Sequence, residues 1–166
     1  MAIRQIVRYP HPALAMPCSP VTTFDTDLRQ LARDLIDTMH AAPGVGITAA
    51  HIGVHRRVVV IELEQQLGPR IFVNPEILSA SAELQEFDEG SVSMPGAVES
   101  VSRPAAIHLR YQTVDGTVQE EEMSGFLATC MQHEIDQLDG IFWLERLSRL
   151  KRERAVKRYE KSQRRA

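Results

Sequence analysis

The sequence predicts an α+β fold, and the distribution of its apolar residues along the chain carries that prediction. Short runs rich in β-branched residues are concentrated between residues 57 and 123, as expected for strands. Helical segments are expected on either side of this region, over residues 25–41, 126–138 and 148–161. Grouped strands with helices towards the ends of the chain indicate an α+β architecture rather than a doubly wound sheet.

Length and composition are those of an ordinary globular protein. The 166 residues fit a single domain, 1–166, and 43% of them are hydrophobic and 25% charged. No apolar run approaches the roughly 18 residues that a membrane-spanning helix needs. Two cysteines, Cys18 and Cys130, are too few for a disulfide framework. We therefore expect a cytoplasmic protein in a reducing environment, with no membrane partner.

The first part of the chain should combine a strand, an irregular segment and a helix. Residues 1–9 are compatible with a short strand, whereas the prolines between residues 10 and 20 each fix φ and remove a hydrogen-bond donor. Apolar residues at helical spacing then predict a helix over 25–41, with Asp25 or Thr23 as its N-cap. It should end before Pro43-Gly44-Val45-Gly46, where two glycines allow a close approach of the backbone to another group.

The middle of the chain is dominated by strand patterns. Five strands are expected, at Arg57–Leu63, Arg70–Asn74, Val98–Ser102, Ile107–Thr113 and Thr117–Met123. Asp115-Gly116 is typical of a hairpin turn between the last two. The helix over 126–138 is apolar on most faces, which predicts that it is buried.

The C-terminal segment is strongly basic. From Arg146 onward, ten Lys and Arg residues accompany only Glu153 and Glu160, a local charge of +8. Because the whole chain carries −3, residues 1–145 carry −11. Two interpretations are open: a contact surface for nucleic acid or another anionic partner, or a solvated helix face.

Three short segments are candidates for chemistry. His133-Glu134-Ile135-Asp136-Gln137 begins like the zinc-binding motif H-E-x-x-H but ends in Gln, so a structural histidine remains an alternative. The other two are Gly44-Val45-Gly46-Ile47-Thr48-Ala49-Ala50-His51 and Glu89-Gly90-Ser91-Val92-Ser93. Ser91 does not lie in a G-x-S-x-G nucleophile elbow, so the sequence gives no serine-hydrolase motif.

In order and spacing, these segments resemble the three motifs of the peptide deformylase family, G-x-G-L-A-A-x-Q, E-G-C-L-S and H-E-x-D-H. The resemblance extends over essentially the whole chain. It implies antiparallel sheets around a buried central helix that carries His133 and Glu134, followed by a basic C-terminal helix. It also implies hydrolytic removal of the formyl group from the N-terminal Met of nascent bacterial and organellar proteins, with Fe(2+) or Zn(2+) as the cofactor.

The resemblance assigns roles to individual positions. His133 corresponds to the first histidine ligand, Glu134 to the general acid/base, and the backbone N–H of Val92 to an oxyanion donor. Asp136 matches the acidic position that supports the site. The implied substrate pocket contains Gly44, Gly46, Ile47, Glu89 and Gly90.

Three positions depart from the family pattern. Ser91 stands where the Cys ligand belongs, Gln137 replaces the second His ligand, and His51 replaces the Gln that contacts the oxyanion. A neutral hydroxyl and an amide oxygen are poor ligands for zinc or iron(II). We therefore expect the metal to be bound weakly or not at all, with His133 as the one retained ligand.

The role of His51 leaves two hypotheses open. In one, His51, His133 and Glu134 bind a metal in a new arrangement. In the other, His51 hydrogen-bonds Ser91 or Gln137 and leaves a polar, metal-free pocket.

Three functions are consistent with the sequence. The chain is a divergent deformylase or related N-acyl hydrolase of weak or altered activity, a non-catalytic protein that binds methionyl or formyl-methionyl N-termini of nascent chains, or a ribosome-associated factor that docks through basic residues 146–165. Binding of methionine requires an apolar pocket, for which Ile47, Val92 and Ile135 are candidates.

Overall fold

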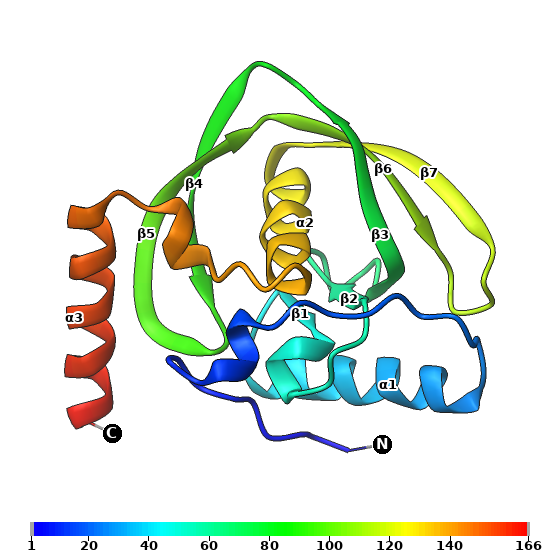
Figure 1. Ribbon diagram of the computed structural model, residues 1–166, viewed down its shortest axis with the longest axis horizontal. Coiled ribbons are helices and arrows are strands. Elements are labelled where there is room, and N and C mark those ends of the chain that lie inside the picture. Colours follow the sequence, from blue (N-terminus) through cyan, green and yellow to red (C-terminus); the bar gives the residue numbers. More distant parts are fainter. Residues whose placement is uncertain (1, 166) are drawn as a thin grey trace.

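Residues 2–165 are described by a computed structural model that contains two antiparallel sheets (Figure 1). The larger sheet has five strands in the order β1 (Gly46–Thr48), β2 (Val58–Ile61), β3 (Arg70–Ala80), β6 (Ala106–Gln112) and β7 (Val118–Ser124). The smaller sheet is the ribbon of β4 (Leu84–Ser91) and β5 (Met94–Pro104).

Helix α2 (Gly125–Leu138) lies at the centre, with strands of both sheets around it (Figure 1). Every residue from Ala128 to Leu138 is buried. Its apolar side chains pack against the inner face of the larger sheet, where Val59, Phe72 and Leu109 are completely buried. The α+β fold and the buried central helix predicted above are therefore confirmed.

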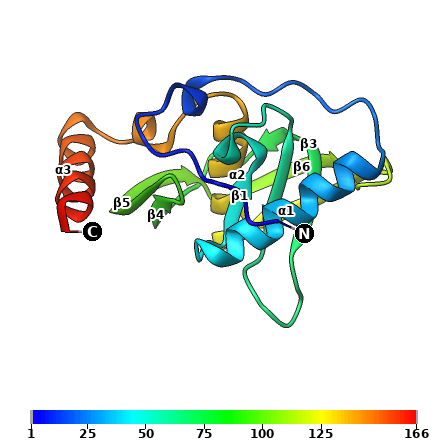
Figure 2. The ribbon, with the colours of Figure 1, turned by 90° about the horizontal axis from the view of Figure 1, so that it is seen from below.

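Helix α1 (Thr26–Ala41) covers a second core at one edge of the larger sheet (Figure 2). The carboxylate of Asp25 accepts a hydrogen bond of 3.0 Å from the backbone N–H of Leu28, so Asp25 is the N-cap. Leu28, Leu31 and Leu35 recur at helical spacing and are buried against β1, β2 and the short 3-10 helix η2 (Ala49–Ile52).

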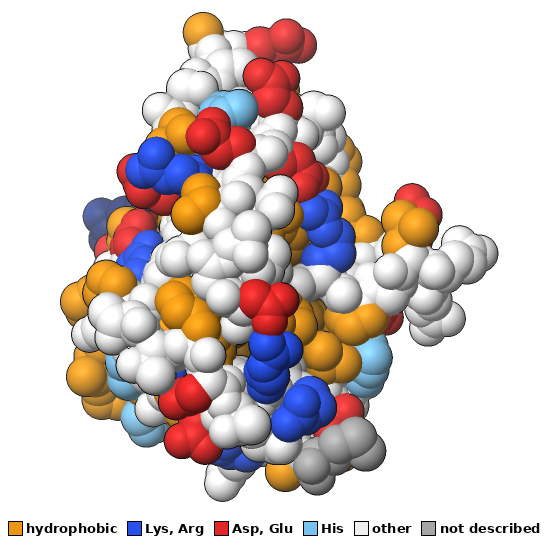
Figure 3. Space-filling view, turned by 90° about the vertical axis from the view of Figure 1, so that its right-hand side faces the viewer, with side chains coloured by type: hydrophobic (Ala, Val, Ile, Leu, Met, Phe, Trp, Pro, Cys, Tyr) orange, Lys and Arg blue, Asp and Glu red, His pale blue; other side chains and the backbone are white. Residues whose placement is uncertain are grey.

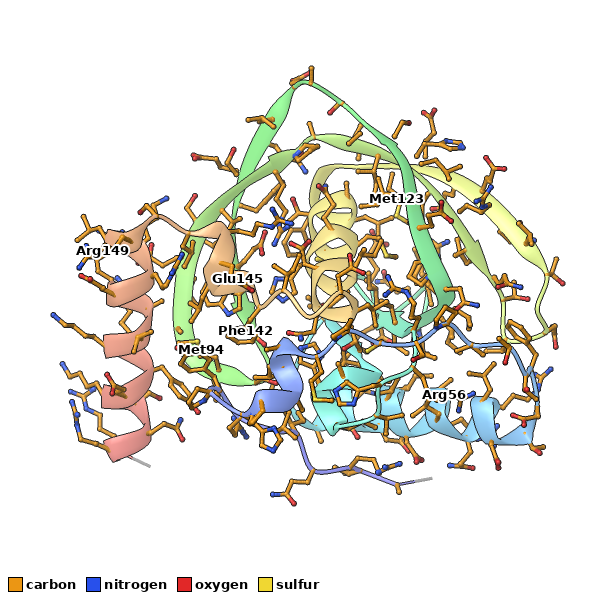
Figure 4. The ribbon with its side chains drawn as sticks, in the orientation of Figure 1. Arg56, Met94, Met123, Phe142, Glu145 and Arg149 are labelled. Carbon is orange, nitrogen blue, oxygen red and sulfur yellow. The ribbon has the colours of Figure 1, made fainter. Side chains whose placement is uncertain are left out.

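Helix α3 (Arg149–Arg165) lies at the far end of the molecule and packs against β5 (Figures 1 and 2). Ala155 and Tyr159 of α3 share a third core with Met94 of β5 and with Phe142, which precedes the 3-10 helix η3 (Trp143–Arg146). Figure 4 shows Met94 and Phe142 in the region between α3 and α2, whereas Arg149 lies at the start of α3.

The prediction of a strand at residues 1–9 is wrong for residues 2–9, and residue 1 lies outside the described residues. The backbone N–H of Val7 bonds the carbonyl of His51 at 2.9 Å, whereas that of Tyr9 bonds the carbonyl of Ser93 at 2.9 Å. Because alternate residues pair with two different segments, no continuous ladder forms. The proline-containing segment that follows forms a further short 3-10 helix, η1 (Pro12–Ala15).

Several strands differ from their predicted bounds. The sequence prediction missed β4, whose residues are mostly polar and alternate between exposed and partly or fully buried, and it missed β1, which lies within the glycine-rich segment. β3 continues past the predicted end at Asn74, because a register shift between Val73 and Glu76 accommodates Pro75. β5 is likewise longer than predicted, and α3 ends at Arg165 rather than near residue 161.

The outer face of β6 and β7 is polar. Figure 3 shows acidic and basic side chains interspersed on the side of the molecule that these strands occupy. Arg110 of β6, for example, pairs with Glu76 of β3 at 3.1 Å. Among residues 2–165, no helix is both long enough and apolar enough to cross a membrane.

We predict that Leu109→Ala lowers the free energy of unfolding by about 2–5 kcal/mol, because it leaves a cavity under α2. The side chain of Leu109 is 0% exposed, whereas that of Leu84 is 60% exposed. Leu84→Ala should therefore change the free energy of unfolding by no more than about 0.5 kcal/mol. Urea unfolding followed by circular dichroism measures both, and equal effects of the two substitutions would contradict the assigned core.

Candidate functional site

A cavity of about 460 Å³ opens beside α2, between β1, the β4–β5 ribbon and the N-terminal segment. Of the residues predicted for the site, nine line it: Gly44, Gly46, His51, Glu89, Gly90, Ser91, Val92, His133 and Glu134. Its apolar wall is made by side chains that include Ile6, Pro43, Val45, Met94 and Phe126. The three motifs thus meet at one cavity, although they are separated by tens of residues in the sequence.

Three predicted residues do not line the cavity. Ile47 is completely buried in the core between α1 and the larger sheet. Gln137 is also buried, and its side-chain amide donates a hydrogen bond of 2.8 Å to the carbonyl of Leu14 in η1. The structure therefore places the side-chain amide of Gln137 in contact with the N-terminal region, and Gln137 is not among the residues that line the cavity. Ile135 likewise belongs to the core under α2.

Glu134 has a carboxylate without a partner at the inner end of the cavity. Its Oε1 is buried and forms no hydrogen bond with any described residue. A Cβ atom at Gly46 would lie only 2.5 Å from Glu134 Oε2, so the absence of a side chain at Gly46 makes room for this carboxylate. Burial raises the pKa of Glu134 to about 7, the nearby Glu89 also raises it, and His133 opposes the shift.

His133 is held by a chain of buried charged groups. Its Nδ1 lies 2.8 Å from Glu89 Oε1, and Arg103 donates two hydrogen bonds to Glu89, of 2.6 and 3.0 Å. Arg103 also donates to Asp136 at 2.9 Å, and Arg146 donates to the same carboxylate from outside. These contacts join α2, which carries His133 and Asp136, to Glu89 on β4 and Arg103 on β5. Each of these buried charges has an oppositely charged neighbour, as burial of a charge requires.

Within this group of buried charges, each residue shifts the pKa of its neighbours. Burial acts to raise the pKa of Glu89, but hydrogen bonds from His133 and Arg103 hold it below its usual value. Burial acts to lower the pKa of His133, whereas the carboxylates of Glu134 and Glu89 raise it above its usual value. Glu89 is therefore an ionised acceptor over the physiological pH range.

The proton of His51 is fixed by its contact with the backbone. His51 Nδ1 accepts a hydrogen bond of 2.9 Å from the N–H of Thr48, which can only donate. The ring hydrogen of neutral His51 is therefore on Nε2, a buried atom that has no partner among the described residues. Burial, with His133 nearby, lowers the pKa of His51 to about 3, so the ring is neutral and presents an N–H donor.

The expected hydrogen bond from His51 to Ser91 or Gln137 is absent from residues 2–165. His51 Nδ1 is instead engaged by Thr48, and Ser91 Oγ accepts a hydrogen bond of 3.1 Å from the backbone N–H of Ser93. That hypothesis is wrong about the partners of His51, although His51 and His133 do share one cavity.

These side chains do not fit a catalytic zinc or iron(II) ion. His51 could offer Nε2 as a ligand only by moving its hydrogen to Nδ1, which would oppose the Thr48 N–H. The Gln137 amide donates to the carbonyl of Leu14, Ser91 offers a neutral hydroxyl, and burial raises the pKa of the Cys130 thiol to about 12. No group of three or more His, Cys, Asp and Glu side chains within residues 2–165 is arranged to hold a metal ion.

Some residues of the site were missed from the sequence. Arg103 connects two motifs, yet it is a lone arginine at the end of a strand pattern, with no motif to mark it. Thr48 acts through its backbone N–H, which any residue supplies. Ile6 and Arg8 line the cavity from the N-terminal segment, whose path could not be predicted from composition.

Comparison with known proteins supports the motif assignment. The family model described as polypeptide deformylase matches residues 3–153. A peptide deformylase-like protein of Brucella melitensis is 62% identical, covering 99% of this chain and 100% of the relative. A peptide deformylase of Phenylobacterium zucineum is 46% identical over 97% of both chains.

Solved structures show the same fold. A peptide deformylase from Legionella pneumophila superposes with a TM-score of 0.93 at 39% identity, covering 98% of this chain and 96% of that one. A peptide deformylase from Ehrlichia chaffeensis in complex with actinonin has a TM-score of 0.91 at 34% identity, covering 99% of both chains.

We predict that Arg103→Met lowers the free energy of unfolding by about 3–5 kcal/mol, because Glu89 and Asp136 lose a buried counter-ion. Both partners are buried, and the Arg103 side chain is 5% exposed. The matched control is Arg110→Met, which removes an exposed ion pair with Glu76 and should cost less than about 1 kcal/mol. Chemical unfolding of the two variants tests this, and similar losses would show that the buried network does not hold the site together.

Proposed function

Because this chain belongs to the polypeptide deformylase family, we propose that it binds the methionyl N-terminus of nascent proteins, with or without the formyl group, and does not carry out the family's metal-dependent hydrolysis. The supporting observation is the cavity itself. It combines an apolar wall with two buried polar atoms that have no partner among residues 2–165, His51 Nε2 and Glu134 Oε1. Unsatisfied buried polar atoms are costly, and a ligand with matching groups would satisfy them.

The size and lining of the cavity suit a short peptide end. Its volume of about 460 Å³ lies within the range typical of sites for small ligands. Val45, Val92, Met94 and Phe126 offer apolar surface to a methionine side chain. At the inner end, the His51 Nε2–H is a donor suited to a carbonyl oxygen, while Glu134 is suited to an N–H group.

The proposed loss of hydrolysis follows from the donor set. In the family, a metal ion lowers the pKa of the attacking water, which is near 15.7 in bulk and about 7 on zinc. The side chains at the ligand positions here do not suit such an ion. Without it, no water molecule with a lowered pKa is available for Glu134 to deprotonate. A divergent hydrolase remains the alternative, and it is an outcome of the test below.

A second part of the proposal concerns α3. Lys157, Lys161 and Arg164 are exposed along the C-terminal half of this helix and form no ion pair within residues 2–165. By contrast, Arg154 and Arg158 are engaged by Glu99 and by the carbonyl of Val98 on β5. On the packed side of α3, cationic side chains therefore contact β5. On its outer side, the exposed cationic side chains are available to bind an anionic partner. The ribosome is the partner we propose, in agreement with the family resemblance.

We predict that a formyl-Met-Ala-Ser peptide binds to the purified protein in isothermal titration calorimetry without release of formate. Gly46→Ala should weaken binding about tenfold or more, a loss of about 1.4 kcal/mol, because the added methyl group displaces the Glu134 carboxylate. Gly68→Ala is the control: it strains the backbone at a φ of 74°, but its methyl group meets nothing within 4 Å and lies outside the cavity, so peptide binding should be unchanged.

Two results would contradict this proposal. One is the absence of binding by the folded protein. The other is formate release on addition of iron(II), nickel or zinc that is abolished by Glu134→Ala, which would identify a working deformylase.

We predict that the triple variant Lys157→Glu/Lys161→Glu/Arg164→Glu shows greatly reduced co-sedimentation with ribosomes, because it reverses the charge of three exposed side chains of α3. Binding by the unaltered chain should fall steeply as salt rises, as expected for contacts with phosphate groups. Arg33→Glu, which reverses an exposed cation on α1, is the control and should bind as before. Equal sedimentation of both variants would rule out α3 as the docking element.

A further inference from the structure

The N-terminal segment forms one wall of the cavity, and its alternate residues face opposite sides. Val7 and Tyr9 pack against the third core, where the Tyr9 ring stacks on that of Phe142 at a centroid distance of 5.4 Å. Ile6 and Arg8 instead line the cavity. Such a period of two is typical of an extended chain, in which successive side chains point to opposite sides. The side chain of Arg8 is therefore directed towards the cavity rather than the core.

The backbone on both sides of Arg8 is held to the cavity wall. The N–H of Val7 donates to the carbonyl of His51 at 2.9 Å, and that of Tyr9 donates to the carbonyl of Ser93 at 2.9 Å. His51 lines the cavity, and both chain neighbours of Ser93 line it as well. Two backbone contacts thus fix the position of Arg8 at the cavity, while its long side chain can still adjust to a ligand.

The guanidinium group of Arg8 is available to a ligand. The side chain is exposed, and it forms neither an ion pair nor a hydrogen bond within residues 2–165. By contrast, Arg4 of the same segment pairs with Asp34 at 3.2 Å. Arg8 is also the one Lys or Arg among the described residues that line the cavity.

The acidic residues of the cavity wall do not neutralise Arg8. Glu89 is already engaged by Arg103, at 2.6 and 3.0 Å, and the buried carboxylate of Glu134 lies at the inner end of the cavity. Asp88 precedes Glu89 on β4. Because the side chain of Glu89 faces α2, alternation along the strand directs the exposed side chain of Asp88 to the opposite face. The positive charge of Arg8 therefore stays uncompensated by the protein.

The other exposed residues of the cavity wall are largely apolar. Val45, Val98 and Phe126 line the cavity and are 46, 46 and 39% exposed. A guanidinium group binds a carboxylate through two parallel hydrogen bonds, and it repels an ammonium or a second guanidinium group. A single cation on an otherwise apolar opening therefore suits a ligand that combines apolar groups with one carboxylate.

From this arrangement we propose that Arg8 is a specificity-determining residue. The cavity favours methionyl peptides that carry a carboxylate close after the methionine, and it disfavours peptides with a lysine or arginine there. The carboxylate belongs either to an Asp or Glu side chain of a nascent chain or to the C-terminus of a free short peptide. This inference rests on the proposed binding of methionyl N-termini, to which it adds the chemical class of the preferred ligand.

The test is isothermal titration calorimetry with C-terminally amidated formyl-Met tripeptides that carry Ala, Asp or Lys at the second or the third residue. The free acid of the neutral peptide is a further ligand. We expect a carboxylate to tighten binding about three- to tenfold relative to the Lys peptide, as for a partly exposed charge-assisted pair. The difference should shrink as salt rises.

Substitution of Arg8 should change this preference in a defined direction. Arg8→Gln should remove the preference for a carboxylate, and Arg8→Glu should reverse it in favour of the Lys peptides. Arg33→Glu makes the same change of charge at an exposed position of α1 that does not line the cavity, so it should keep the original preference. Thermal unfolding of each variant shows whether it is folded.

Equal affinity of the unaltered chain for the neutral, Asp and Lys peptides and for the free acid would overturn the inference and leave the proposed function in place. An unchanged preference in folded Arg8→Glu would overturn it as well. No binding of any peptide would reject both ideas. A preference for Asp in the amidated peptides would support recognition of nascent chains, whereas a preference confined to the free acid would support recognition of free short peptides.

Discussion

The structure depends on the pairing of charged groups along helix α2, whose residues from Ala128 to Leu138 are all buried. Helix α2 is surrounded by both sheets, yet it carries His133, Glu134 and Asp136. Burial of such groups is unfavourable unless each has a partner. Glu89 and Arg103 provide these partners from β4 and β5, and so they fix the β4–β5 ribbon against α2. Because the cavity lies between this ribbon and α2, the same pairs that stabilise the fold also shape the site.

Glu134 is the exception to this pairing, and it explains much of the cavity's character. Its carboxylate has space only because position 46 is glycine, and no described residue satisfies Oε1. Two of the three departures from the family motifs, at Ser91 and His51, add a neutral hydroxyl and a neutral ring to the cavity that Glu134 lines, and the neutral Cys130 thiol lines it as well. Side chains of this kind suit hydrogen bonding to an organic ligand. They do not suit a cation that needs thiolate and imidazole ligands.

Much of the fold could be predicted because its signals are local. The cap at Asp25, the apolar spacing of α1 and the apolar faces of α2 each act within a few residues. Strand β4 was missed because its side chains are mostly polar, and the N-terminal strand was predicted where two unrelated backbone contacts occur instead. For the site, the motifs identified nine of the cavity residues. The direction of Gln137 and the role of Arg103 could not be predicted, since both depend on contacts with residues distant in the sequence, such as Leu14 and Glu89.

The most direct test of a metal-free cavity is the metal content of the protein itself, purified without chelators and measured by inductively coupled plasma mass spectrometry. A relative with intact E-G-C-L-S and H-E-x-D-H motifs, prepared in parallel, serves as the positive control. The donor set around His133 predicts iron, nickel and zinc far below one equivalent per chain, also after incubation with each metal and desalting. One tightly held equivalent of any of these metals, lost on His133→Gln, would contradict the account.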